Sequence, residues 1–217
     1  EIRLSLVGSE MCIRDSSILP NGEVIDTVAL NSVTGVDVTT TANVGRYVDQ
    51  IEITNQSGSN GFDAANYDLS YVDGDLVVNQ RAVTLTASQQ ERIYGDELLL
   101  DDTAFTLLDL DGDTVLPNGE VIDTVALTSA NGVDTMTTAS VGRYGDEIVI
   151  TDQTGSGGFA SGNYDLSYVD GDLVVNQRAV TLTASQQERI YGDSMALDDT
   201  AFTLLDLDGD SVLPNGE

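Results

Sequence analysis

The chain contains neither histidine nor lysine, and its single cysteine is Cys12. A serine nucleophile would therefore lack its usual base, and histidine-based metal chemistry is excluded. With one cysteine, neither a disulfide framework nor a cysteine-rich zinc site can form. We expect a protein that is not an enzyme and that is stabilised by hydrophobic cores.

Positive charge is also scarce. The 217 residues include 37 acidic side chains and only 8 basic ones, all arginine, and the formal net charge is -29. Such a charge repels nucleic acid and anionic membrane surfaces. No transmembrane run is visible in the sequence. We expect no nucleic-acid partner and no direct membrane insertion by this part of the protein.

The most informative feature that is present is a long repeat. Leu-Pro-Asn-Gly-Glu begins at Leu19, Leu116 and Leu213, and Tyr-Asp-Leu-Ser-Tyr-Val-Asp-Gly-Asp-Leu-Val-Val begins at Tyr67 and Tyr164. Both motifs recur after 97 residues. Solenoid repeats have periods of roughly 20 to 50 residues, whereas about 100 residues is a common size for a self-sufficient domain. The period predicts a tandem array of whole domains.

The repeat also sets the predicted domain boundaries. One complete unit spans residues 81–177, preceded by the C-terminal part of a unit at 17–80 and followed by the N-terminal part of another at 178–217. Residues 1–16 do not match the repeat and resemble a translated sequencing adapter, so we expect a non-native leader; a native leader is the alternative. No glycine- or proline-rich spacer separates the units, which favours an extended and fairly stiff array.

The pattern within the complete unit is that of an all-β domain. Val83, Leu85 and Ala87 alternate with threonines, which is the period of a half-buried strand. No helical spacing of apolar residues persists over ten positions. Further strands are predicted at 91–94, 104–110, 120–127, 133–139, 147–151, 164–168 and 172–175. The predicted fold is a series of small β-sandwich-like domains, either Ig-like or of a helix-poor β-grasp-like type.

Two local features support finer predictions. The Asp-Gly pair at 170–171 lies between alternating apolar runs, which favours a type I′ hairpin turn because both central residues need positive φ. Val149 is replaced by Glu52 in the preceding copy, whereas the isoleucines corresponding to Ile148 and Ile150 are retained. This difference indicates that the two isoleucines point toward the core.

Several short motifs accompany these strands. Tyr-Gly-Asp occupies 94–96, Val-Gly-Arg-Tyr occupies 141–144, and Asn-Tyr-Asp-Leu-Ser-Tyr occupies 163–168. With these motifs the unit resembles the MBG repeats, of the YGX type, found in large bacterial surface and secreted adhesin-like proteins. The resemblance implies a β-rich tandem module with an extracellular or cell-surface location, associated with the outer membrane. It supplies no catalytic residues.

An acidic segment departs from that family pattern. The candidate metal ligands in its two copies are Asp109, Asp111, Asp113 and Glu120, and Asp206, Asp208, Asp210 and Glu217. In each copy they occupy positions 1, 3, 5 and 12 of a twelve-residue stretch, as in EF-hand-type calcium loops. Thr114 stands where such a loop requires glycine, and no helices are expected on either side. This spacing suggests calcium and no other cofactor, and a solvated acidic turn without a cofactor is the alternative.

These features together predict a structural or adhesive segment of a large exported bacterial surface protein, acting as a stalk or as a multivalent adhesion module. Its partners would be a host surface, a glycan or a neighbouring cell-surface component, besides the adjoining repeats. The alternative is an extracellular β module that binds calcium or glycan. Tyr144, Tyr164 and Tyr168 could then form a platform for a sugar, although packing in the core is the other interpretation of these rings.

Overall fold

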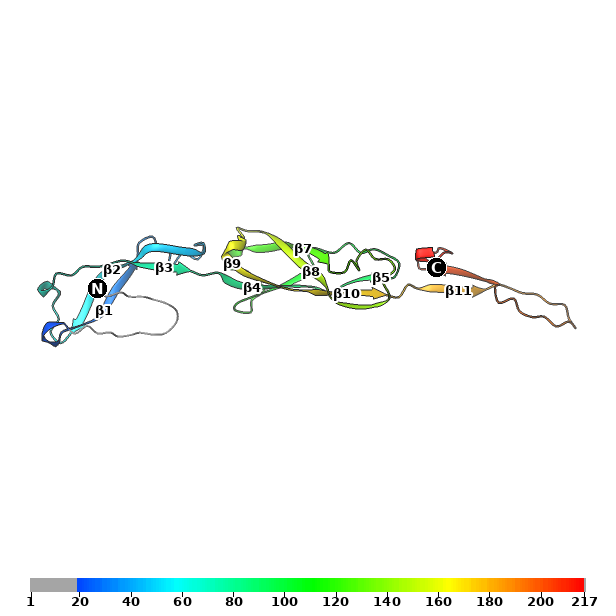
Figure 1. Cartoon of the computed structure of the whole chain (residues 1–217), viewed down its shortest axis with the longest axis horizontal. Coiled ribbons are helices and arrows are strands. Elements are labelled where there is room, and N and C mark those ends of the chain that lie inside the picture. The colour runs from blue at the N-terminus through cyan, green and yellow to red at the C-terminus, as the bar shows by residue number, and fades with distance from the viewer. Residues whose placement is uncertain (1–18, 217) are drawn as a thin grey trace. The chain divides into compact units, whose positions relative to one another are not determined.

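The computed structural model describes residues 19–216 (Figure 1). The chain divides into two compact units, with the boundary between Asn79 and Gln80. The first unit holds the earlier partial copy of the repeat. The second holds the complete repeat and the partial copy that follows it. The leader predicted at 1–16 lies outside the described residues.

Residues 19–216 form strands and short 3₁₀ turns and contain no α-helix, which confirms the predicted all-β class. The first unit contains η1 (Pro20–Gly22), β1 (Val24–Ser32), β2 (Gly45–Ser59), η2 (Ala64–Asn66) and β3 (Gly74–Val78). The complete repeat contains β4 (Arg81–Ala87), β5 (Gln90–Ile93), β6 (Phe105–Asp109), η3 (Pro117–Gly119), β7 (Val121–Ser129), β8 (Gly142–Ser156), η4 (Ser161–Asn163), β9 (Tyr164–Val169) and β10 (Gly171–Asn176). The following copy contains β11 (Val180–Ala184), β12 (Phe202–Asp206) and η5 (Pro214–Gly216). Over this range the chain forms no helix of the length and apolarity that a membrane crossing requires.

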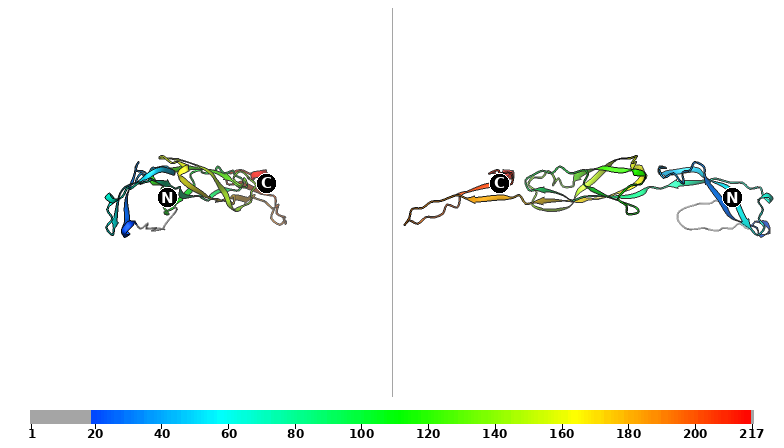
Figure 2. Two further views of the ribbon diagram at one scale, coloured as in Figure 1. Left: turned by 60° about the vertical axis from the view of Figure 1, so that its left-hand side comes forward. Right: turned by 180° about the vertical axis from the view of Figure 1, so that it is seen from behind.

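The first unit is a single antiparallel sheet in the order β1-β2-β3 (Figure 2). Val28 of β1 is 44% exposed, whereas its equivalent in the complete repeat, Val125 of β7, is 1% exposed. Within the described residues, this unit has no counterpart of β4 and β6. Its sheet therefore lacks the strands that bury the same positions in the complete repeat.

The complete repeat folds into two sheets, with strand orders β6-β4-β9 and β5-β10-β8-β7. β4 runs parallel to β9 and β5 runs parallel to β10, while the other neighbouring strands are antiparallel. The chain crosses from one sheet to the other between β4 and β5, and again between β9 and β10. The first and last segments of the repeat are therefore paired with each other in both sheets.

One hydrophobic core lies between these sheets. Val83 and Leu85 of β4 share a cluster of buried side chains with Ile148 of β8 and Leu173 of β10, and none of the four is more than 1% exposed. Ala87 belongs to the same cluster, so the alternating positions of β4 point inward as their spacing predicts. Two sheets around one core confirm the sandwich-like fold.

The predicted hairpin at 170–171 is wrong. β9 and β10 belong to different sheets, and neither Asp170 nor Gly171 has a positive φ. A Cβ atom on Gly171 would lie 2.6 Å from the carbonyl oxygen of Ala87 and 3.0 Å from that of Ser88. Glycine is required here by the close approach of two backbone segments, not by a tight turn.

The strand predicted at 133–139 is also wrong. This segment forms turns in which the Met136 N–H donates to the Gly132 carbonyl at 3.0 Å and the Ala139 N–H donates to the Met136 carbonyl at 2.9 Å. Val133 and Ala139 are nonetheless buried. The apolar pattern reflects side chains that cover the core from a loop, which strand periodicity does not distinguish from a ladder. The other predicted strands are confirmed, and apart from 147–151 their bounds agree to within two residues.

The strand predicted at 147–151 is the centre of β8, which is 15 residues long. Ile148 and Ile150 are 0% and 4% exposed, whereas Val149 is half-buried. The inward orientation inferred from the difference between copies is confirmed. β10 then ends at Asn176, and β11 begins at Val180, so the junction between copies is short. The stiffness of the array stays a prediction.

Candidate functional site

The acidic segment of the complete repeat is a turn organised by Asp109, the last residue of β6. Its Oδ1 accepts hydrogen bonds from the N–H of Asp111 at 2.9 Å and from the N–H of Asp113 at 2.8 Å. The Asp109 N–H donates to the Asp113 carbonyl at 2.9 Å. An aspartate that caps its own turn in this way is a common device for reversing the chain.

The other carboxylate oxygen of Asp109 accepts hydrogen bonds from an arginine. Arg81, the first residue of β4, donates to Asp109 Oδ2 from Nε at 2.9 Å and from Nη2 at 2.6 Å, and it also contacts Asp111. The Asp109 side chain is 1% exposed. The hydrogen bond from Arg81 lowers the pKa of Asp109 against the effect of burial, and the N–H groups of Asp113 and Asp111 lower it further.

Glu120, the fourth candidate ligand, is engaged elsewhere. Its Oε2 accepts a hydrogen bond from the hydroxyl of Tyr164 at 2.9 Å. Burial, and then this hydrogen bond, raise the pKa of Tyr164 to about 12. Among residues 19–216 no group of three or more carboxylate, cysteine or histidine side chains is arranged to hold a metal ion. Calcium binding stays a prediction.

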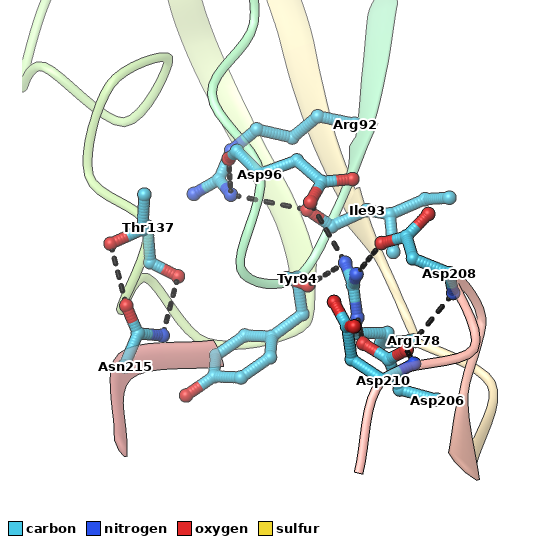
Figure 3. Close-up of polar contacts among 10 residues, drawn as sticks. All are labelled: Arg92, Ile93, Tyr94, Asp96, Thr137, Arg178, Asp206, Asp208, Asp210 and Asn215. Carbon is cyan, nitrogen blue, oxygen red and sulfur yellow. Dashed lines mark hydrogen bonds and ion pairs between the residues drawn. The ribbon is translucent and has the colours of Figure 1, made fainter. Parts of the chain in front are cut away.

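The same turn recurs in the following copy. Asp206 Oδ1 accepts from the N–H groups of Asp208 and Asp210 at 3.0 and 2.9 Å, and Arg178 Nε donates to Asp206 Oδ2 at 3.0 Å (Figure 3). Glu217 lies outside the described residues. The sequence spacing therefore located a real structural unit, but it missed the arginine that begins each repeat and occupies the carboxylate.

A second buried carboxylate, Glu147 of β8, was not predicted. It is 1% exposed, and its Oε1 accepts from the N–H of Asn131 at 2.8 Å and of Val133 at 3.3 Å, as well as from the Ser129 hydroxyl. Oε2 accepts from Asn131 Nδ2 at 2.7 Å. Burial raises the pKa of Glu147, but these hydrogen bonds outweigh it and hold the pKa below its usual value. Glu147 therefore anchors the loop after β7.

The three tyrosines of the proposed sugar platform have separate environments. Tyr164 is 4% exposed and stacks on Phe159 with ring centroids 5.5 Å apart, which places it in the core. The Tyr144 hydroxyl donates to the Ser140 carbonyl at 2.8 Å. Tyr168 is 40% exposed and bonds to a glutamine of β8. Core packing therefore accounts for Tyr164, the most buried of the three.

Part of the chain matches a known protein family. Residues 83–174 match the family model of the MBG domain, YGX type. This part of the chain is an MBG domain. The match covers the two sheets from β4 to β10, and it confirms the resemblance seen in the sequence motifs. No curated protein and no solved structure matches the chain. MBG domains are typical of surface and secreted proteins.

Proposed function

We propose that this chain is a structural or adhesive segment of a large exported bacterial surface protein, where its tandem MBG domains form a stalk or present repeated surfaces. The family match supports a surface or secreted location. The 97-residue period supports a role in which one module is used many times. In this proposal the module bears load, contacts a host surface, a glycan or a neighbouring cell-surface component, and has no catalytic role.

The strand pairing of the MBG domain is the observation that carries this proposal. The chain enters through β4 and leaves through β10, and the β4–β5 segment is paired in parallel with the β9–β10 segment. Parallel pairing places the Arg81 end and the Asn176 end at opposite ends of these ladders. A pulling force applied through the chain would therefore load all of the ladder hydrogen bonds together instead of opening them one at a time. Such shear geometry suits a stalk.

Single-molecule extension of the chain between its two ends tests the mechanical part. The complete repeat should unfold in one high-force step that releases roughly 350 Å of chain, less its folded length. Gradual lengthening without a step would contradict load-bearing. Labelling of intact producing cells with an antibody against residues 81–177 tests the location, and staining only after permeabilisation would contradict surface exposure.

A further inference from the structure

The complete repeat and the copy that follows it meet through Arg178. This arginine donates from Nε to Asp206 and contacts Asp208, both in its own copy, and it donates from Nη1 to Asp96 Oδ1 of the preceding repeat at 2.8 Å (Figure 3). Its side chain is only 8% exposed. One guanidinium therefore joins the acidic turn of one copy to the Tyr-Gly-Asp motif of the other.

A second contact brings the Pro-Asn-Gly turn of the later copy onto the same surface. A Cβ atom on Gly95 would lie 2.5 Å from Cγ and 2.6 Å from Cβ of Pro214, so only glycine leaves room for the proline ring. The Thr137 hydroxyl donates to Asn215 Oδ1 at 2.8 Å, and Asn215 Nδ2 donates to the Thr137 carbonyl at 3.4 Å. The turn thus rests on both the Tyr-Gly-Asp motif and the loop before β8.

We propose that the Tyr94-Gly95-Asp96 motif is a docking surface whose partner is the next repeat of the same chain. Asp96 supplies a carboxylate for the incoming arginine, and Gly95 supplies a surface without a side chain for the incoming proline. The motif recurs at Tyr191-Gly192-Asp193. Each repeat therefore offers the surface on which the following one docks.

The charge of the protein makes this arginine important. Two acidic domains repel each other, and the net charge of -29 leaves few cations to oppose that repulsion. A nearly buried arginine that contacts carboxylates from both copies supplies a local attraction that salt screens less than it screens an exposed pair. Beside it lies an open hollow lined by Tyr94, Val141, Gln177 and Leu213. The orientation of the copies should thus depend on the few contacts made by this arginine and by the Pro-Asn-Gly turn.

The full chain allows a direct test. In a Cys12→Ser background, spin labels on Thr106→Cys and Thr203→Cys report the distance between β6 and β12, at equivalent exposed positions of the two copies. Pulsed dipolar spectroscopy should give one narrow distance distribution for this parent. Asp96→Asn should broaden it by removing the charge that Arg178 contacts, and Gly95→Ala should broaden or shift it by displacing Pro214.

The later copy of the motif provides matched controls. Gly192 has φ +97°, close to the +94° of Gly95, but a Cβ atom there would meet nothing within 4 Å. Gly192→Ala therefore introduces the same backbone strain without a clash, and it should leave the distribution as in the parent, as should Asp193→Asn. A parent distribution that is already broad, or equal broadening by motif and control variants, would overturn the proposal. If Gly95→Ala lowers the β-sheet signal in circular dichroism, that variant has lost part of its fold. The comparison of Asp96→Asn with Asp193→Asn then decides whether the motif docks the next repeat.

This inference rests on the proposed stalk for its biological role, but the two fail separately. A broad parent distribution would exclude docking and leave the single high-force unfolding step of the MBG domain unaffected. Absence of that step, with a narrow distribution that the motif variants broaden, would exclude load-bearing and leave docking in place.

Discussion

Arg81 donates two hydrogen bonds, from Nε and Nη2, to the same oxygen of Asp109, at 2.9 and 2.6 Å. These residues lie at the start of β4 and at the end of β6, which are antiparallel neighbours. The same pair recurs as Arg178 and Asp206. One arginine thus fixes the entry of each repeat to its acidic turn.

Asp109→Asn should lower the melting temperature of the MBG domain more than Asp111→Asn does. Asp109 is buried and caps the turn, whereas the Asp111 side chain is 63% exposed. Because the folded-state pKa of Asp109 is lowered, its stabilisation is present above the unfolded aspartate pKa of about 3.9 and is lost as the pH falls through the folded pKa. Thermal melts followed by circular dichroism should show the difference from the parent narrowing below about pH 4. Equal effects of the two substitutions would contradict this.

Glu147→Gln should destabilise the domain by about 1–3 kcal/mol. The side-chain nitrogen of the new glutamine would face a hydrogen-bond donor that in the parent protein bonds to a carboxylate oxygen of Glu147. The preceding copy has Gln50 at this position, and Thr34, which bonds to it, in place of Asn131. Adding Asn131→Thr should therefore recover part of the loss. Urea unfolding of the two single variants and the double variant measures this coupling. If the losses of stability in the two single variants simply add in the double variant, the side chains at positions 131 and 147 do not compensate for each other.

The inward residues of β4 were predictable because an alternating pattern in a strand depends only on which side of the sheet is buried. The strand predicted at 133–139 was wrong because burial there depends on a contact that is distant in the sequence. Val133 and Ala139 are buried by a loop that Glu147 anchors from β8, and a contact between a loop and a distant strand leaves no local period. The Asp-Gly pair at 170–171 led to a wrong turn prediction, because glycine can be required either by a positive φ or by the close approach of two backbone segments.

The candidate metal site was also only partly predictable from the sequence. The spacing of Asp109, Asp111 and Asp113 identified a turn that the structure contains, since an aspartate cap is a local feature. Arg81 lies far from them along the sequence and is brought close by the pairing of β4 with β6. The available clue was that arginine is the only cation of the chain and occupies the first position of each repeat.

Gly171→Ala should destabilise the domain by about 1–3 kcal/mol, because the new methyl group would overlap the backbone of Ala87 and Ser88. Its equivalent in the first unit, Gly74, is the matched control, since a Cβ atom there would meet Ile51 at an ordinary 3.5 Å. Gly74→Ala should leave the melting of the MBG domain unchanged. Similar melting curves for the two variants would show that close packing does not explain the glycine.

Hydrogen exchange should separate two strands of identical sequence. Val-Thr-Leu-Thr-Ala occupies 83–87 in β4 and 180–184 in β11, but β4 lies between two neighbours, whereas within the described residues β11 pairs with β12 alone. Leu85 is fully buried and its equivalent Leu182 is 64% exposed. At low concentration, residue-resolved exchange should be slow throughout β4 and fast for the β11 amides that point away from β12. Equal protection would indicate that β11 has acquired a partner.

Alkaline titration should isolate Tyr164. Burial and the hydrogen bond to Glu120 raise its pKa to about 12, so the folded state favours the neutral phenol. The stabilisation is present below the pKa of an unfolded tyrosine, about 10, and is lost as the pH rises through the folded value. Tyr164→Phe cannot ionise and should give a flatter dependence of stability on pH in that range. The tyrosinate absorbance of the parent minus that of this variant should titrate with a midpoint of about 12; a midpoint near the ordinary tyrosine value would show that the phenol is neither buried nor bonded in solution.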